Sequence, residues 1–148
     1  RTFSKAYGLA GLRIAYGIAS HPSLIDALNR VRTPYNVNQA AQEAAKAAWL
    51  DPHHVKRSRE FVASERRRLT EGLQAAGFRV APSQANFLFI DTACNALEVV
   101  DELLKDGIIV KAWREPGYSG FIRVSLGLAH ENQAFLASLQ RAVTALAG

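Results

Sequence analysis

The hydrophobic pattern in the first third of the chain predicts one short strand and two helices. After Arg13, apolar residues alternate with small ones as far as Ile18, and this period of two predicts a strand. A helix follows, because Pro22 suits a first helical turn and apolar residues recur behind it at helical spacing until Thr33-Pro34. The alanine-rich run that starts at Asn38 predicts a second helix.

A long helix is predicted in the middle of the chain. Asp51 is suited to cap its start, Pro52 follows at the first position, and apolar residues recur up to Gly77, a residue type that often ends helices. Helices of this length often join two domains. We therefore divide the chain into residues 1–52 and residues 53–148, the second part comprising the linking helix and a smaller domain.

Shorter elements are predicted after this helix, because short apolar runs are bounded there by turn residues. Strands are expected at Phe78–Ala81, Asn86–Ile90, Ile108–Ala112 and Phe121–Leu126, and helices at Ala96–Lys105 and Glu131–Leu146. The resulting ββαββα order favours a compact α/β layer of about 90 residues.

Composition narrows the class of protein. Apolar residues make up 49% and charged residues 21% of the 148 positions, which is ordinary for a globular protein and excludes a disordered tail or a fibre. The longest purely apolar runs are Phe87–Ile90 and Ile108–Val110, far shorter than the roughly 20 residues of a membrane helix. We therefore expect no membrane partner.

The net charge of +5 arises largely in the predicted long helix, where basic residues between Lys56 and Arg68 are partly offset by acidic ones. Mixed-sign helices are usually solvated surface, and no interleaved aromatic residues or groove-reading motif point to a nucleic-acid partner. His53 and His54 are adjacent and so lie on different helix faces, and we expect no metal site. The single cysteine, Cys94, is expected to be structural.

The strongest chemical signal lies in the first residues of the chain. Lys5 stands beside the hydroxyl residues Thr2 and Ser4, small residues follow, and Arg13 comes eight positions later. A lysine amine can form a Schiff base with a carbonyl, while hydroxyls, backbone N–H groups and a guanidinium suit a phosphate dianion. This combination is typical of a pyridoxal phosphate site. The spacing alone also fits solvated surface, where Ser-Lys pairs are common.

Four segments of the chain together resemble one enzyme family. They are RTFSKAYGLAGLRIAYG, TPYNVNQAAQEAA, SQANFLFI and GIIVKAWREPGYSGFIRVSLG. In this order they resemble the fold-type I pyridoxal-phosphate aminotransferases, and most of all the histidinol-phosphate aminotransferase group. The resemblance covers essentially the whole chain. It implies the C-terminal portion of an α/β transferase fold, with residues 1–52 as the remainder of the cofactor-binding large domain and a small ββαββα domain after the linking helix.

The resemblance implies roles for five residues. Lys5 matches the lysine that carries pyridoxal and moves the substrate's proton. Thr2, Ser4 and Arg13 match positions that bind the cofactor phosphate, and Arg123 matches the arginine that pairs with the substrate's α-carboxylate. A planar guanidinium suits this last task, because it can bind a carboxylate through two parallel hydrogen bonds. Without the resemblance, Arg123 would be interpreted as a strand-end arginine in a surface ion pair.

The same resemblance implies an activity. It is pyridoxal-phosphate-dependent transamination between histidinol phosphate or imidazole-acetol phosphate and glutamate or 2-oxoglutarate, in histidine biosynthesis, by a cytoplasmic homodimer. The chain opens at Arg1 and contains no methionine, so we expect a truncated chain from a longer protein. Family members supply the aspartate beside the pyridine nitrogen from upstream of the lysine, and we therefore expect the 148-residue chain by itself to be inactive.

Three other functions remain open at the level of sequence. An aromatic amino-acid aminotransferase and a threonine-phosphate decarboxylase share the general lysine motif with the histidinol-phosphate group. A non-catalytic domain that serves only in folding or association is the third. The acceptor substrate would separate the first two from the favoured activity, and the reading frame upstream of the lysine would test the third.

Overall fold

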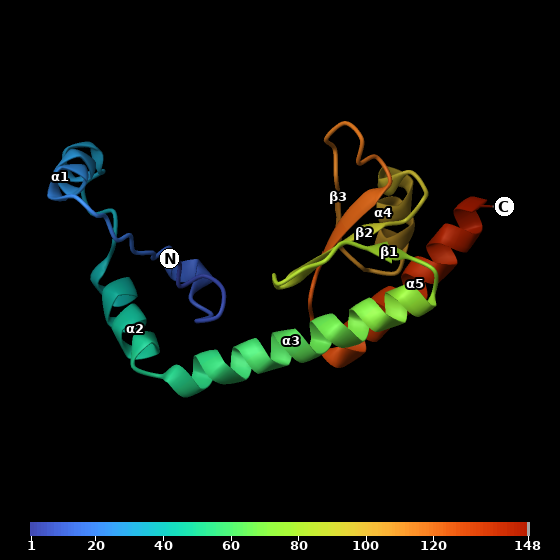
Figure 1. The fold of residues 1–148 in the computed structure, drawn as a ribbon, viewed down its shortest axis with the longest axis horizontal. Helices are drawn as coiled ribbons and strands as arrows, with labels where there is room; N and C mark the ends of the chain where they lie inside the picture. The colour runs from blue at the N-terminus through green and yellow to red at the C-terminus, as the bar shows by residue number, and fades with distance from the viewer. Residues whose placement is uncertain (148) are drawn as a thin grey trace. The chain divides into compact units, whose positions relative to one another are not determined.

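The computed structural model describes residues 1–147, and these form two compact units (Figure 1). The first unit is Arg1–Arg59, and the second begins at Glu60. The boundary falls inside one continuous helix, α3 (Pro52–Ala75), which is the long helix that the sequence predicts.

The strand predicted after Arg13 is not formed, and that prediction is wrong. A short 3-10 helix, η1 (Ala10–Leu12), comes first, and Arg13 then takes a left-handed backbone conformation with φ 53° and ψ 50°. Ala15 pairs with Thr2 in an isolated antiparallel bridge. A strand needs a partner over several consecutive residues, and in the described residues the pairing here is limited to this one bridge and the main-chain hydrogen bonds that flank it.

Two helices follow in the first unit, and both begin where local signals place them. α1 (Pro22–Val31) has a proline in its first turn and is capped by His21. α2 (Gln39–Trp49) is capped by Asn38, whose Oδ1 accepts a hydrogen bond from the Ala41 N–H at 2.8 Å. Helix caps depend on neighbouring residues, so the sequence is sufficient to locate these ends.

The ends of α3 are also set by neighbouring residues. Asp51 Oδ1 accepts a hydrogen bond from the His54 N–H at 3.0 Å, and this bond lowers the pKa of the Asp51 carboxyl below its ordinary value. At the other end Gly77 has φ +89°, a conformation that L side chains rarely adopt, and its N–H donates to the Gln74 carbonyl at 3.0 Å. The predicted cap residues are confirmed at both ends.

The second unit contains a four-stranded antiparallel sheet with strand order β1-β2-β4-β3. After α3 the elements are β1 (Arg79–Val80), β2 (Phe87–Asp91), α4 (Ala96–Lys105), β3 (Lys111–Ala112), β4 (Phe121–Ser125) and α5 (Ala129–Ala147). This is the predicted ββαββα order, and α4 has the predicted bounds.

The two edge strands are shorter than predicted, with two residues each. The predicted third strand began at Ile108, but this residue completes the end of α4 instead. Its N–H donates to the Leu103 carbonyl at 3.0 Å, while the Gly107 N–H donates to the Leu104 carbonyl at 2.9 Å. Ile109 is 85% exposed. The apolar run therefore serves as a helix end and a connection before it pairs with β4.

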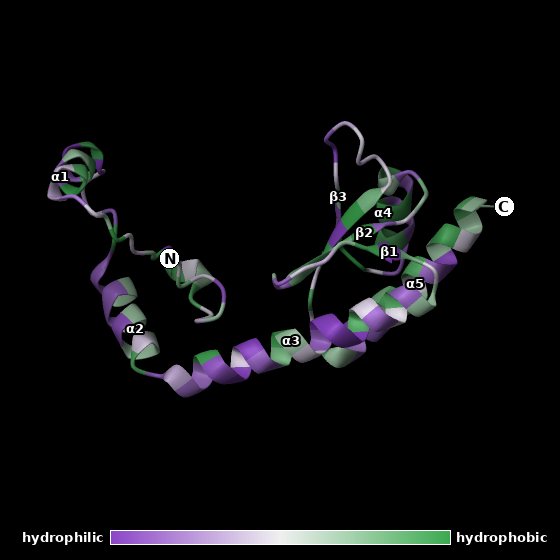
Figure 2. Cartoon of the chain, viewed as in Figure 1, coloured by the Kyte–Doolittle hydropathy of each residue, from purple (hydrophilic) through white to green (hydrophobic). Residues whose placement is uncertain are grey.

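The sheet has one core face and one partly open face. Residues along β2 and β4 alternate between buried and half-buried. The buried ones, such as Leu88, Ile90 and Ile122, pack with apolar residues of α3, α4 and α5. Figure 2 shows hydrophilic and hydrophobic residues alternating along α3, as expected for a helix with one buried side. The half-buried residues of the opposite face are Phe87, Phe89, Asp91, Phe121 and Arg123.

Candidate active site

The segment that carries Lys5 is held by main-chain pairing with the residues after the 3-10 helix. The Phe3 N–H donates to the Ile14 carbonyl at 3.2 Å, and the Tyr16 N–H donates to the Arg1 carbonyl at 2.8 Å. These bonds flank the bridge between Thr2 and Ala15. The backbone on the N-terminal side of Lys5 is thus fixed although no regular strand is present.

Phe3 anchors this segment in the core of the first unit. Its side chain is 6% exposed and contacts the alanine-rich face of α2, where Ala41 and Ala45 are buried. Its ring centroid lies 4.7 Å from that of Tyr7 and 6.5 Å from that of Trp49. The alanines of α2 therefore matter because small side chains let an aromatic ring approach the helix closely.

Thr2 and Ser4, on either side of Phe3, form a hydroxyl pair. The Thr2 hydroxyl donates to Ser4 Oγ at 2.9 Å, and the Ser4 N–H donates to Thr2 Oγ1 at 3.0 Å. Thr2 is exposed and Ser4 is half-buried. Hydroxyl hydrogens rotate to suit the acceptor that is present, so this pair can turn donors toward an anion.

Lys5 follows the hydroxyl pair directly and is exposed. Its carbonyl accepts a hydrogen bond from the Gly8 N–H at 2.9 Å, which closes a tight turn, and Gly8 has φ +72°. Within residues 1–147, the Lys5 amine has no hydrogen-bond or ion-pair partner. The turn thus presents an amine that no neighbouring carboxylate engages.

Arg13 lies at the same end of the paired segment as Ser4, because it precedes Ile14 in the chain as Ser4 follows Phe3. Its guanidinium donates one hydrogen bond, to the Ala10 carbonyl at 2.8 Å. A guanidinium has five N–H donors, so several remain for a ligand. The structure therefore brings the predicted residues Thr2, Ser4, Lys5 and Arg13 into one short folded segment of the first unit.

Arg123 belongs to the second unit, where it occupies the middle of β4, one of the two inner strands of the sheet. It pairs in register with Phe89 of β2 and with Lys111 of β3. Its side chain is half-buried on the partly open face, and the guanidinium carbon lies 4.8 Å from the centroid of the Phe87 ring. No carboxylate of the described part of the chain forms an ion pair with it. The surface ion pair considered for this residue is therefore absent.

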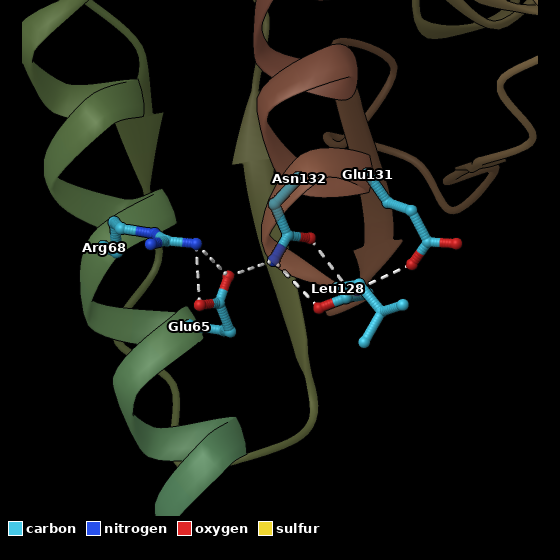
Figure 3. A network of polar contacts seen from close by, with 6 residues as sticks. Glu65, Arg68, Leu128, Glu131 and Asn132 are labelled. Carbon is cyan, nitrogen blue, oxygen red and sulfur yellow. Dashed lines mark hydrogen bonds and ion pairs between the residues drawn. The ribbon is translucent and has the colours of Figure 1, made fainter.

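Sequence reasoning missed a buried polar network that joins α3 to α5 (Figure 3). Glu65 is 5% exposed and pairs with Arg68 at 2.8 Å. Asn132, also 5% exposed, donates through Nδ2 to Glu65 Oε2 at 2.8 Å and to the Gly127 carbonyl at 3.0 Å. The Gly127 N–H returns a bond to Asn132 Oδ1 at 3.0 Å. No local signal distinguishes Glu65 from the solvated acidic residues of α3.

Other kinds of site find no support in the part of the chain that the structure describes. No group of three or more His, Cys, Asp or Glu side chains there could hold a metal ion. No helix among those residues is both long and apolar enough to cross a membrane. Cys94 is a free, half-buried thiol.

Comparison with known proteins identifies the family. The model of the family described as aminotransferase class I and II matches residues 1–139. The chain belongs to this family. Over 140 residues it is 51% identical to histidinol-phosphate aminotransferase 3 of Rhizobium meliloti (strain 1021), a match that covers 95% of this chain and 38% of that protein. The chain thus spans well under half the length of this aminotransferase.

Solved structures show the aminotransferase fold. Histidinol-phosphate aminotransferase from Sinorhizobium meliloti, in complex with pyridoxal-5'-phosphate, matches with a TM-score of 0.88 and 31% identity, over 99% of this chain and 41% of that one. L-threonine-O-3-phosphate decarboxylase from Porphyromonas gingivalis matches with a TM-score of 0.73 and 23% identity, over 95% and 44% of the two chains. At 23% identity, the second likeness shows a shared fold alone. The predicted α/β aminotransferase fold is confirmed.

Proposed function

We propose that the chain is part of a pyridoxal-phosphate-dependent enzyme that transfers an amino group between histidinol phosphate or imidazole-acetol phosphate and glutamate or 2-oxoglutarate. The observation that supports the proposal is an exposed lysine, Lys5, that directly follows the Thr2–Ser4 hydroxyl pair in the chain. The 51% identity to a histidinol-phosphate aminotransferase supports this choice of substrates. We further propose that the whole enzyme is a cytoplasmic homodimer.

The donors around Lys5 suit pyridoxal phosphate. Thr2 and Ser4 offer two adjacent hydroxyls, and Arg13 offers guanidinium N–H groups beyond the one bonded to the Ala10 carbonyl. A phosphate dianion takes charge-assisted hydrogen bonds of this kind. These three residues would therefore hold the phosphate, and Lys5 would supply the amine that condenses with the aldehyde.

Lys5 has two tasks in this proposal. Its amine attaches the cofactor, and its Nζ later takes a proton from the α-carbon of the amino substrate and returns it during the transfer. When bound, pyridoxal phosphate supplies an electron sink that makes this proton acidic. Because Lys5 is exposed on a tight turn and pairs with no carboxylate in residues 1–147, its amine is free for both tasks.

Arg123 has the properties of a carboxylate-binding residue. Its guanidinium lies on the partly open sheet face, engages no carboxylate in the described part of the chain, and can bind one through two parallel hydrogen bonds. Glutamate and 2-oxoglutarate both carry an α-carboxylate. We therefore assign orientation of these two substrates to Arg123.

The test uses the whole protein of which this chain is a part. It is treated with borohydride, digested and analysed by mass spectrometry, and the reduced cofactor is expected on Lys5. The Lys5→Ala variant is expected to lose the bound cofactor's visible absorbance and the activity, whereas Lys46→Ala, at an exposed lysine of α2, retains both. A reducible cofactor on another lysine in Lys5→Ala would refute the assignment.

The substrates are tested separately from the lysine. Wild-type enzyme is incubated with glutamate and either imidazole-acetol phosphate or phenylpyruvate, and 2-oxoglutarate is measured. The proposal predicts faster turnover with imidazole-acetol phosphate. A preference for phenylpyruvate would instead identify an aromatic amino-acid aminotransferase.

A further inference from the structure

We propose that Phe87 is a positioning residue for Arg123: the face of its ring holds the guanidinium and leaves the N–H donors to the substrate's carboxylate. The inference rests on the role proposed for Arg123 and adds to it the means by which the side chain is aimed. It is supported by the geometry of the partly open face of the sheet.

The strand register places the two side chains together. Phe87 lies opposite Ser125, and Phe89 lies opposite Arg123, so Phe87 and Arg123 are diagonal neighbours on one face of β2 and β4. The guanidinium carbon is 4.8 Å from the ring centroid, within the range of a cation–π interaction. Both side chains are half-buried, and partial removal from water strengthens this attraction.

The kind of partner that Arg123 has determines how many of its N–H donors remain available to a ligand. A carboxylate partner would occupy N–H donors of the guanidinium, as Asp91 Oδ2 occupies Nη2 of Arg79 in the same sheet. An aromatic face attracts the positive charge without accepting those hydrogens. Arg123 is therefore held in place while its donors stay available, which is the state that a carboxylate-binding residue requires before the substrate arrives.

Phe87 differs from the other aromatic residues of this face. Phe89, Phe121 and Tyr118 pack on one another, with centroids 4.8 Å apart for Phe89 and Phe121 and 5.3 Å apart for Tyr118 and Phe121. Within the described residues, Phe87 makes no ring–ring contact, and Arg123 is the group over its face. Its ring is therefore engaged by the cation and not by the aromatic cluster.

The backbone at Phe87 is fixed from two directions. The Ser83 hydroxyl donates to the Phe87 carbonyl at 2.9 Å, and the Leu126 N–H donates to the Asn86 carbonyl at 3.0 Å. One residue further back, the Arg66 guanidinium of α3 donates to the Ala85 carbonyl at 3.0 Å. Because these bonds hold the backbone at Phe87, its ring has little freedom to move with the guanidinium. The ring can therefore fix the orientation of the Arg123 side chain.

The test measures KM for glutamate and kcat in the whole enzyme. Phe87→Leu is expected to raise KM about threefold to tenfold, the worth of one partly buried cation–π contact, with kcat within about twofold of wild type. Phe87→Tyr keeps an aromatic face and is expected to restore the wild-type KM. Phe121→Leu is the matched control, because it removes a ring from the same sheet face without a described contact to Arg123.

A series of fluorinated phenylalanines at position 87 keeps the shape of the ring while weakening its negative face, and so tests the contact even if Phe87→Leu fails to fold. The proposal predicts a KM that rises stepwise with fluorination. A flat series overturns it, as does a KM in Phe87→Leu no higher than in Phe121→Leu. If Arg123→Gln leaves KM for glutamate unchanged, the role of Arg123 itself fails. If Arg123→Gln raises KM and the Phe87 variants do not, the inference about Phe87 alone fails.

Discussion

Replacing Asn132 by alanine should loosen the junction between β4 and α5. The substitution removes three hydrogen bonds, one to Glu65 and two to the Gly127 main chain. Glu65 keeps its pairing with Arg68, but one acceptor position of a carboxylate that is 5% exposed loses its partner. An unsatisfied buried polar group costs about 1–3 kcal/mol, and Gly127, half-buried, recovers part of its loss through water. The expected loss of stability at the junction is about 2–3 kcal/mol in total.

Hydrogen exchange of the whole protein, followed by mass spectrometry on peptides that span residues 126–132, measures this change locally. A loss of about 2–3 kcal/mol corresponds to exchange that is about 30- to 150-fold faster for amides that exchange through local opening. Gln133→Ala is the matched control, since Gln133 is the exposed polar neighbour on the same helix. Equal exchange in the two variants would show that the buried network contributes nothing to this junction.

Two other predictions follow from the polar contacts. Hydrogen bonds from Ser138 and then Arg141 lower the pKa of Asp106, so its contribution to stability is present above its ordinary value of 3.8 and is lost as the pH falls through the lowered one. The Tm of wild type should therefore exceed that of Asp106→Asn at neutral pH, and the two Tm values should converge as the pH falls below about 4. A difference in Tm that stays constant with pH would contradict this. If Thr2 and Ser4 hold the cofactor phosphate as we propose, Thr2→Val or Ser4→Ala in the whole protein should weaken pyridoxal phosphate binding about tenfold or more in a fluorescence titration, because each would remove a hydrogen bond to a charged group. Unchanged affinity would exclude these hydroxyls from the phosphate site.

Several features of the candidate site could be predicted from the sequence because they depend on neighbouring residues. The turn after Lys5 closes through Gly8, and the hydroxyls of Thr2 and Ser4 are two positions apart, so their contact is local. Helix ends behave in the same way: α4 has its predicted bounds because Asn95 caps its start and Gly107 follows its end. The resemblance to aminotransferases added the roles of these residues, which spacing alone left open.

Long-range pairing accounts for the errors and omissions. The alternation after Arg13 is typical of a strand, yet the chain provides a partner only around Ala15. The edge strands have two residues each because the residues before them have a competing use: the Phe78 N–H bonds the Leu73 carbonyl at the end of α3, and the Ile108 N–H bonds the Leu103 carbonyl at the end of α4. Whether an apolar run becomes a strand depends on which backbone lies beside it, and this information is distributed over distant parts of the sequence.

The amino-acid sequence by itself determined the order of the elements from α3 onward, the caps of α2, α3 and α4, and the tight turn that follows Lys5, since each follows from contacts within a few residues. The tertiary structure decided that Glu65 is buried against Asn132, which lies 67 positions away, and that Arg123 rests on Phe87 without a carboxylate partner in the described residues. Burial and pairing of charged side chains depend on which distant residues the folded chain brings beside them. For that reason the partner of Arg123, for which the sequence had left a surface ion pair open, could be identified only from the fold.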